Sequence, residues 1–362
     1  MHNRRHAEPA HLKIEPMSIH VKSVALNCAF CAAAYVGVGM VSITHASDSA
    51  YRVVARQVLS GPVRWDYLAV DSVKHHVFLT RGDHVDVFDA TTKTIVGTIA
   101  DTAGVHGVAL ANDLNRGYTS NGASDSVTVF DLTTFAPIAS IAVGGKPDAI
   151  VYDPASKRVF VANARDRTLS VIDTGTNRAL KSIALTGTPE TAVVNAKGLL
   201  FVALEDKNAI AVIDTAAMTV LRQYDVGPAC DEPAGLAIDS ATDHLFAGCH
   251  NAKMAVVDGR TGKLLATPAI GQGNDATGYD AQRNRVFASN GDGTLTVING
   301  AAPFGVLQTV PTMARGRTMA LDTTSHQLFI VSAELAPDAP APAKGRPPLK
   351  SGTFTLLTLA PE

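Results

Sequence analysis

An aromatic residue recurs along this chain at nearly even intervals, each time inside a short apolar segment. These aromatic residues are 40 to 45 positions apart: Phe78, Tyr118, Phe160, Phe201, Phe246, Phe287 and Phe329. A second apolar segment follows each one, as in the run VDVFD at residues 85–89. Alternation of apolar and polar residues with a period of two indicates β-strands. A repeat of this length limits the chain to folds in which similar units stack on one another.

The third repeat shows how one unit divides into strands. We place its strands at residues 149–152, 158–163, 169–172 and 179–183, with turn-forming residues between them. A unit of four short strands in 40 to 45 residues is typical of a propeller blade. The sequence therefore predicts an all-β, seven-bladed β-propeller of four-stranded blades, with six or eight blades as the alternatives.

The two ends of the repeat region complement each other. The seventh repeat runs out of sequence after its third strand, which is expected to end near Leu357. Residues 51–63 (YRVVARQVLSGPV) resemble the outer strand of the third repeat, from Leu180 to Pro189. We therefore expect the N-terminal strand to complete and close the last blade, because this pairing removes an open sheet edge.

Residues 1–46 differ from the repeats, and we predict an N-terminal extension and signal peptide there, with the propeller over residues 47–362. From Met17, the expected start, a short basic segment precedes an apolar run that extends from Val24 to Ile43, and Ala46 follows. This order is that of a secretory signal. About 20 apolar residues can also span a bilayer, so a retained anchor is the alternative, but the small residues in the run argue against a permanent membrane span. The protein is thus expected to be periplasmic or secreted.

The cysteine positions agree with export. Cys28 and Cys31 lie in the apolar run of the predicted signal, which leaves Cys230 and Cys249 in the mature chain. An even number of cysteines in an oxidising compartment indicates a disulfide. A hairpin turn at residues 240–243 would bring Cys249 opposite Ala234, close to Cys230. We therefore predict a Cys230–Cys249 disulfide, with two buried free thiols as the alternative.

One segment interrupts the pattern in the last repeat. Residues 333–351 are rich in Pro and Ala (APDAPAPAKGRPPLKS is part of the run). This composition favours an extended loop over a helix or strand. We interpret the segment as a surface insertion, and a lid or partner-docking loop is the functional alternative.

Several segments resemble the YVTN-repeat propellers, in particular the YncE-like exported proteins. Strands such as VFVAN at residues 159–163, followed by the Val-Ile-Asp-Thr pattern at residues 171–174, carry this resemblance. The runs at residues 230–239, 245–251 and 290–297 are also similar to that family. The resemblance covers residues 51–360 and implies an exported β-propeller. Because the motifs define scaffold strands, they imply no particular activity.

A ring of ionisable residues is expected at one end of the central channel. Five residues before the end of each innermost strand, the chain has in turn Asp66, His106, Asp148, Glu190, Ala234, Asp275 and Arg317. Only the fifth cannot ionise, and Glu232 lies two residues before it. Clustered carboxylates raise one another's pKa or bind a cation. We therefore predict a cation or polar-ligand site, with Asp66, Asp148, Glu190 and Asp275 as candidate metal ligands; a wet channel lined by polar groups is the structural alternative.

The sequence contains no GxSxG elbow, phosphate-binding loop, dinucleotide fingerprint or zinc-binding His spacing. We therefore predict a non-catalytic, monomeric scaffold that presents the channel-mouth rim to an unidentified small molecule or protein. The net charge of −2 disfavours nucleic acid as a partner. The alternative is a metal-assisted hydrolase or lyase, in which the four carboxylates hold a divalent cation, His106 acts as acid/base and Arg317 binds an anionic group. Trp65 is expected at the rim, either stacked on a ligand or packed between blades.

Overall fold

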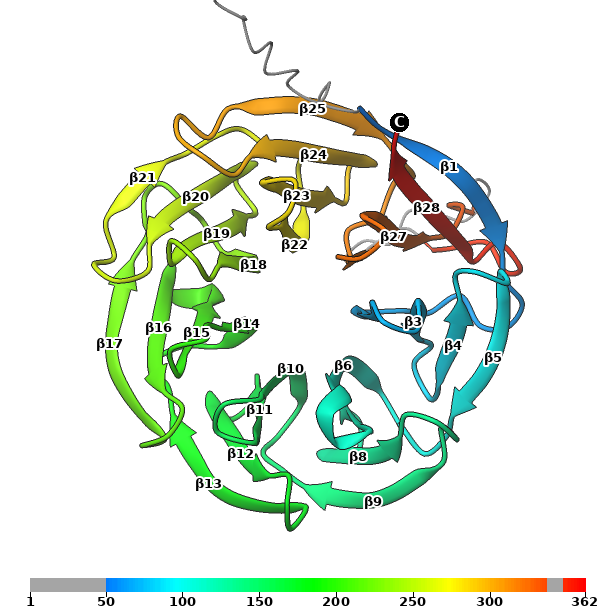
Figure 1. Cartoon of the computed structure of the whole chain (residues 1–362), viewed down its shortest axis with the longest axis horizontal. Coiled ribbons are helices and arrows are strands. Elements are labelled where there is room, and N and C mark those ends of the chain that lie inside the picture. Colours follow the sequence, from blue (N-terminus) through cyan, green and yellow to red (C-terminus); the bar gives the residue numbers. More distant parts are fainter. Residues whose placement is uncertain (1–49, 337–347) are drawn as a thin grey trace, which may run out of the picture. The chain divides into compact units, whose positions relative to one another are not determined.

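The computed structural model of the protein describes residues 50–336 and 348–362. These residues form seven antiparallel four-stranded sheets that follow one another around a ring (Figure 1). The predicted seven-bladed β-propeller is confirmed. The predicted signal peptide and most of the Pro-rich insertion lie outside the described residues. Within the described ranges, no helix has the length and hydrophobicity that crossing a membrane requires.

In six blades the four strands follow one another along the chain, from the channel to the outer edge. Their bounds are β2 (Leu68–Asp71), β3 (His76–Thr80), β4 (Val85–Asp89) and β5 (Thr94–Ile99) in blade 1; β6 (Val105–Ala111), β7 (Arg116–Asn121), β8 (Ser126–Asp131) and β9 (Pro137–Ala142) in blade 2; β10 (Pro147–Asp153), β11 (Arg158–Asn163), β12 (Thr168–Asp173) and β13 (Arg178–Ala184) in blade 3; β14 (Pro189–Val194), β15 (Leu199–Leu204), β16 (Ala209–Asp214) and β17 (Thr219–Asp225) in blade 4; β18 (Pro233–Asp239), β19 (His244–Cys249), β20 (Lys253–Asp258) and β21 (Leu264–Ala266) in blade 5; and β22 (Asn274–Asp280), β23 (Arg285–Asn290), β24 (Thr294–Asn299) and β25 (Val306–Pro311) in blade 6. Two short 3-10 helices, η1 (Asn112–Leu114) and η2 (Glu205–Lys207), lie in the turns of blades 2 and 4.

Blade 7 is built from both ends of the chain, as predicted. Its sheet has the order β1 (Tyr51–Val58), β28 (Thr355–Pro361), β27 (Gln327–Ser332) and β26 (Met319–Asp322). The third strand, β28, continues to Pro361 rather than ending near Leu357, because it pairs with the whole length of β1. The closing strand therefore makes a full antiparallel ladder.

Two buried side chains fasten this closure. Tyr51 is 3% exposed, its ring packs edge-on against Phe287 of blade 6 at 4.9 Å, and its hydroxyl donates to the His326 carbonyl. Arg81 is 1% exposed and donates hydrogen bonds of 2.8 Å to the carbonyls of Ser60 and Pro62, the residues that lead from β1 into blade 1. The closing segment is therefore bound to blades 6 and 1 as well as to blade 7.

The aromatic residues that define the repeat form the core between the blades. All seven are at most 1% exposed: Phe78, Tyr118, Phe160, Phe201, Phe246, Phe287 and Phe329. The buried residues of the described chain group into seven hydrophobic clusters, each shared by two adjacent blades. Each sheet thus buries both faces against its neighbours, which explains why the units fold only as a ring.

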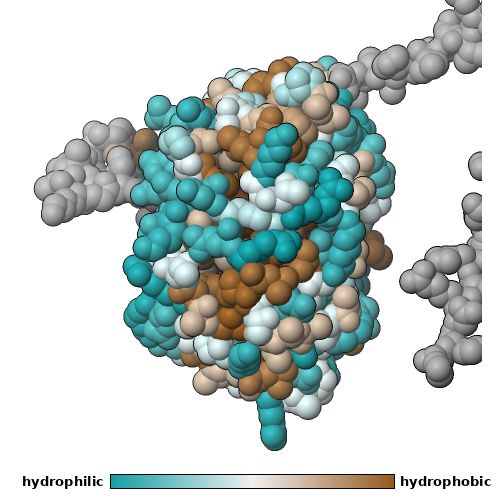
Figure 2. All heavy atoms as spheres, turned by 90° about the vertical axis from the view of Figure 1, so that its left-hand side faces the viewer, coloured by the Kyte–Doolittle hydropathy of each residue, from teal (hydrophilic) through white to brown (hydrophobic). Residues whose placement is uncertain are grey.

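The outer strand of every blade in the described chain carries one β-bulge. In β13, for example, Ala179 pairs with Ile172 and Lys181 pairs with Val171, so Leu180 between them has no partner. The unpaired residue is apolar and exposed in all seven blades: Val54, Val96, Ile138, Leu180, Leu221, Leu265 and Leu307. Figure 2 views this outer side of the ring and shows hydrophobic side chains among hydrophilic ones.

Candidate functional site at the channel mouth

Five of the seven aligned rim positions lie where an innermost strand departs from regular pairing, whereas Asp66 and Arg317 precede the regularly paired strands β2 and β26. In β10, Pro147 pairs with Asn163 and Ile150 pairs with Val161. Two residues of β10, Asp148 and the alanine after it, therefore lie opposite a single residue of β11. The same irregularity occurs in β6, β14, β18 and β22. A bulge changes the direction of a side chain and is common beside functional sites. The alignment of rim positions thus coincides with a repeated feature of the backbone.

Three rim residues form a charged group in which His106 contacts Asp66 and Asp148. His106 Nδ1 lies 2.5 Å from Asp66 Oδ2 and 3.6 Å from Asp148 Oδ1. Burial alone would lower the pKa of His106, but the hydrogen bond to Asp66 and the charges of both carboxylates raise it. The pKa of Asp148 is raised by burial, and the charge of His106 opposes this rise. The group therefore favours an imidazolium held between two carboxyl groups.

Tyr67 crosses the channel, which the sequence analysis did not anticipate. This residue precedes β2 of blade 1, yet its hydroxyl donates a 2.7 Å hydrogen bond to Glu190 Oε1 on β14 of blade 4. Its backbone N–H donates to the carbonyl of His106. Burial raises the pKa of Glu190 well above its usual value, and the charges of Asp148 and Asp275 add to the rise. Burial and the neighbouring carboxyl groups therefore both favour the neutral form of Glu190 over its carboxylate.

The remaining rim residues also have partners. Arg317 Nη1 lies 3.0 Å from Asp275 Oδ2. Glu232 Oε2 lies 2.7 Å from His250 Nδ1. Together with Glu205 these two residues form a second cluster, in which the possible metal-ligand atoms lie within 4.8 Å of one another. The four carboxyl groups predicted to hold a metal thus contact an imidazole, a tyrosine hydroxyl or a guanidinium. Asp66, His106 and Asp148 each offer a ligand atom within 4.8 Å of the others and could hold a metal ion, so the cation site stays a prediction.

Glu190→Gln is expected to stabilise the protein increasingly as pH rises. Since the folded-state pKa of Glu190 is raised, the folded protein binds this proton more tightly than the unfolded chain, and stability falls as pH rises through the raised pKa. Glutamine keeps an acceptor for Tyr67 and does not ionise. Thermal unfolding of both proteins between about pH 5 and pH 8 measures this difference. The exposed Glu334→Gln is the control, and a difference for Glu190→Gln that does not change with pH would contradict the argument.

A pocket lies beside His106. It has a volume of about 560 Å³ and is lined by Arg64, Gly104, His106, Gly122, Ala123, Lys146 and Arg165. We call it the His106 pocket. None of these described lining residues is acidic, and four of them carry or can carry a positive charge. Arg165 also pairs with Asp125 at 2.6 Å, while Asp66 and Asp148 contact His106 without lining the pocket.

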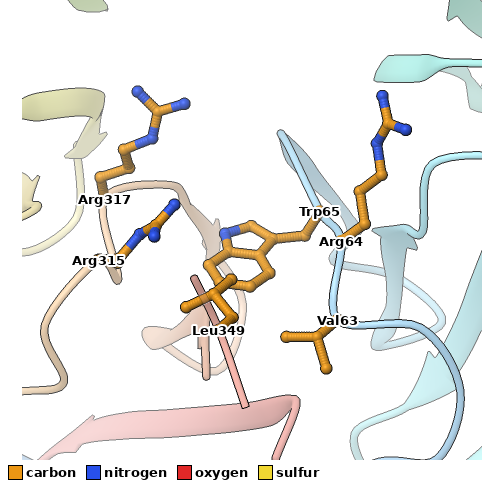
Figure 3. Close-up of a pocket in the computed structure, with 6 residues that line it drawn as sticks. All are labelled: Val63, Arg64, Trp65, Arg315, Arg317 and Leu349. Carbon is orange, nitrogen blue, oxygen red and sulfur yellow. The ribbon is translucent and has the colours of Figure 1, made fainter. Parts of the chain in front are cut away.

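A second pocket of about 150 Å³, which we call the Trp65 pocket, lies between blades 7 and 1. It is lined by Val63, Arg64, Trp65, Arg315, Arg317 and Leu349 (Figure 3). Arg64 lines both pockets, so the two adjoin. The predicted alternatives for Trp65 are compatible, because its ring packs on Phe354 at 5.8 Å and also lines this pocket.

The sequence pattern points to Arg317, Trp65 and His106 but not directly to the other basic residues of the two pockets. A signal for them exists in the same alignment, two positions earlier, where Arg64, Lys146 and Arg315 occupy three of the seven places. Lys146 and Arg315 have φ of 52° and 67° there, so this position is a turn before the innermost strand. The basic residues therefore recur in the repeat, one turn outside the ionisable rim.

Comparison with known proteins supports the fold. The sequence profile of the YNCE-like beta-propeller matches residues 42–197, and that of the outer membrane protein assembly factor BamB matches residues 123–336. No curated protein sequence matches the chain. Among solved structures, the Kuenenia stuttgartiensis hydrazine synthase is 16% identical, with a TM-score of 0.67, over 76% of this chain and 94% of that chain. The structure of U3-55K is 9% identical, with a TM-score of 0.72, over 85% of this chain and 99% of that chain.

At these identities the two solved structures show the fold and nothing of the activity. The profile matches overlap in blades 2 to 4 and together extend over residues 42–336. They agree with the repeat of buried aromatic residues and with the ring of seven four-stranded blades. The chain belongs to the repeat propellers that these profiles describe, and its family is that of the YncE-like β-propellers.

Proposed function

We propose that this protein is an exported, non-catalytic binding propeller that takes an anionic ligand in the His106 pocket. The observation that carries the proposal is the composition of this pocket, in which Arg64, Lys146, Arg165 and His106 face one space without an acidic neighbour in the described lining. Arg165 and His106 also have carboxylate partners outside the lining, and an anion in the pocket would be attracted by all four groups. Hydrogen bonds from charged donors to an anion are also stronger than neutral ones.

The acidic rim supports this assignment through its contacts with His106. Asp66 and Asp148 both contact His106. They raise its pKa and hold the ring, so that the imidazole carries its proton over a wider pH range. The carboxylates then act on the ligand through His106 rather than as metal ligands.

Export is supported by the disulfide. Cys230 and Cys249 are joined, with a Cα–Cα distance of 5.3 Å, and both are fully buried. Disulfides persist in secreted and periplasmic proteins and are rare in reducing compartments. Together with the secretory pattern at residues 17–46, the disulfide supports a periplasmic or secreted protein.

Citrate is expected to raise the melting temperature of the protein at constant ionic strength, because a ligand that binds only the folded state stabilises it. Lys146→Gln should weaken citrate binding about tenfold or more, since a hydrogen bond to a charged group contributes about 1.5–3 kcal/mol. Thermal unfolding and calorimetric titration measure both effects. Lys263→Gln, which removes an equal charge from an exposed turn of blade 5, is the control and should bind citrate normally. Equal affinities of the Lys146→Gln protein and the parent would refute the assignment of this pocket.

The metal-assisted alternative makes a different prediction in the same assay. After treatment with a chelator, calcium, magnesium or manganese would raise the melting temperature, and Asp148→Asn would abolish the increase. We expect none of these cations to stabilise the protein, because His106 and Tyr67 already contact the rim carboxyl groups. A metal-dependent increase in melting temperature that requires Asp148 would contradict the anion proposal and support the hypothesis of a metal-assisted hydrolase or lyase.

A further inference from the structure

The Trp65 pocket differs from the His106 pocket in having an apolar half. Val63, Trp65 and Leu349 provide this half, and Arg64, Arg315 and Arg317 provide the other. We propose that the Trp65 pocket binds an organic acid in which a planar apolar group is joined to a carboxylate. This inference rests on the proposed function and specifies which class of anion binds at the channel mouth.

The arginines supply the carboxylate half of the site. In Figure 3 the guanidinium groups of Arg64 and Arg317 project in the same direction from opposite sides of the indole, and Arg315 lies beside the ring. Arg317 contacts Asp275 through Nη1, and a guanidinium has five N–H donors, so this contact uses only part of its capacity. The planar fork of a guanidinium matches the geometry of a carboxylate.

The apolar half selects against a simple inorganic anion. One side of the Trp65 ring packs on Phe354, which is fully buried, so the indole is held in place. Leu349 forms a β-bridge with Leu335, and the N–H of Lys350 donates to the carbonyl of Glu334. These contacts fix a small hydrophobic wall below the indole (Figure 3). A planar apolar group gains from contact with this wall, whereas phosphate does not.

The site can be tested with one specific signal, because Trp65 is the only tryptophan of the chain. Phenylacetate is expected to change the tryptophan emission of the full chain in a saturable way. Phenylacetamide, which has the same shape without the charge, should bind at least about tenfold more weakly, because the charged hydrogen bonds are lost. Acetate, which lacks the ring, should also bind at least about tenfold more weakly, because it forgoes the apolar contact. These three ligands test the proposal on the unmodified protein.

Two variants locate the effect in the pocket. Arg315→Gln and Arg317→Gln should each weaken phenylacetate binding about tenfold or more. Arg178→Gln removes the same charge from exposed strand β13 and should leave the affinity unchanged. The inference is overturned if phenylacetamide binds as well as phenylacetate, if inorganic phosphate changes the emission with the same affinity, or if Arg178→Gln weakens binding as much as the pocket variants.

The outcome also separates this inference from the proposed function. Citrate binding that depends on Lys146, together with tryptophan emission that does not respond to phenylacetate, would refute the Trp65 site alone. If neither citrate nor phenylacetate stabilises the protein or changes its emission, both proposals are wrong. Phenylacetate binding that requires Arg315 and Arg317 supports the site whatever the response to citrate.

Discussion

A chain that starts at Arg64, and so lacks β1 and its connection to blade 1, is expected not to fold at 37 °C. The deletion removes the whole outer ladder on β28 and the buried Tyr51. Removal of a large buried aromatic side chain alone costs about 3–5 kcal/mol. The deletion also removes the carbonyls of Ser60 and Pro62, which accept hydrogen bonds from the buried Arg81. The free energy of unfolding of a folded protein is only about 5–15 kcal/mol. These losses together therefore approach the whole free energy of unfolding.

A second deletion provides the control. Replacing residues 337–347 with a short Gly-containing turn should change the melting temperature little, because Ala336 and Pro348 are already paired and the cost of closing a loop varies slowly with its length. Circular dichroism and thermal unfolding compare the two proteins with the parent. A cooperative transition at the parent's temperature in the chain that starts at Arg64 would show that β1 does not close the ring.

Replacing Cys230 and Cys249 together with alanine is expected to lower the free energy of unfolding by about 3 kcal/mol. The bridge closes a segment with a sequence separation of 19, and a loop of this size gives about that value when the entropy of the unfolded chain is considered. Both residues belong to the cluster between blades 4 and 5, so the loss of two buried sulfur atoms adds a smaller packing cost. The effect should appear as a lower melting temperature.

The reduced parent protein is the matched control for this variant. Reduction of the parent under mild denaturant should produce a similar loss of stability, while the double alanine variant should not respond to the reductant. Thiol titration of the unreduced, unfolded parent should detect no free thiol from this pair. Two titratable thiols in the protein purified from an oxidising compartment would contradict the bridge.

The number of blades and the closure of the ring were predictable from sequence because both follow from local periodicity. Strands β10 to β13 lie within two residues of the expected ranges at each end. The repeat works as a signal because Phe160 and its equivalents each occupy the same buried place between two sheets. The Cys230–Cys249 pair was predictable for a similar reason, although the bulge in β18 places Pro233 rather than the expected Ala234 opposite Cys249.

The candidate site was only partly predictable, because its contacts join residues that are distant in the chain. The alignment found His106 and Asp66, which are 40 residues apart in equivalent positions of adjacent blades. It did not find Tyr67, whose contact with Glu190 depends on the width of the channel and not on any periodicity. The sequence alone could not show that the rim carboxyl groups contact His106, Tyr67 and Arg317, and the predicted cation among them stays a prediction.

The bulges in the outer strands bear on whether neighbouring molecules can pair through the edges of their sheets. The last strand of a sheet presents free N–H and C=O groups, on which a strand from another molecule can assemble. In each of the seven blades of the described chain, one residue such as Leu180 interrupts that row. An approaching strand cannot keep its register past this point, so intermolecular sheets of the amyloid type cannot extend along the edge. The apolar side chain exposed at each of the seven edges thus lies at the position where added strand pairing is least favourable.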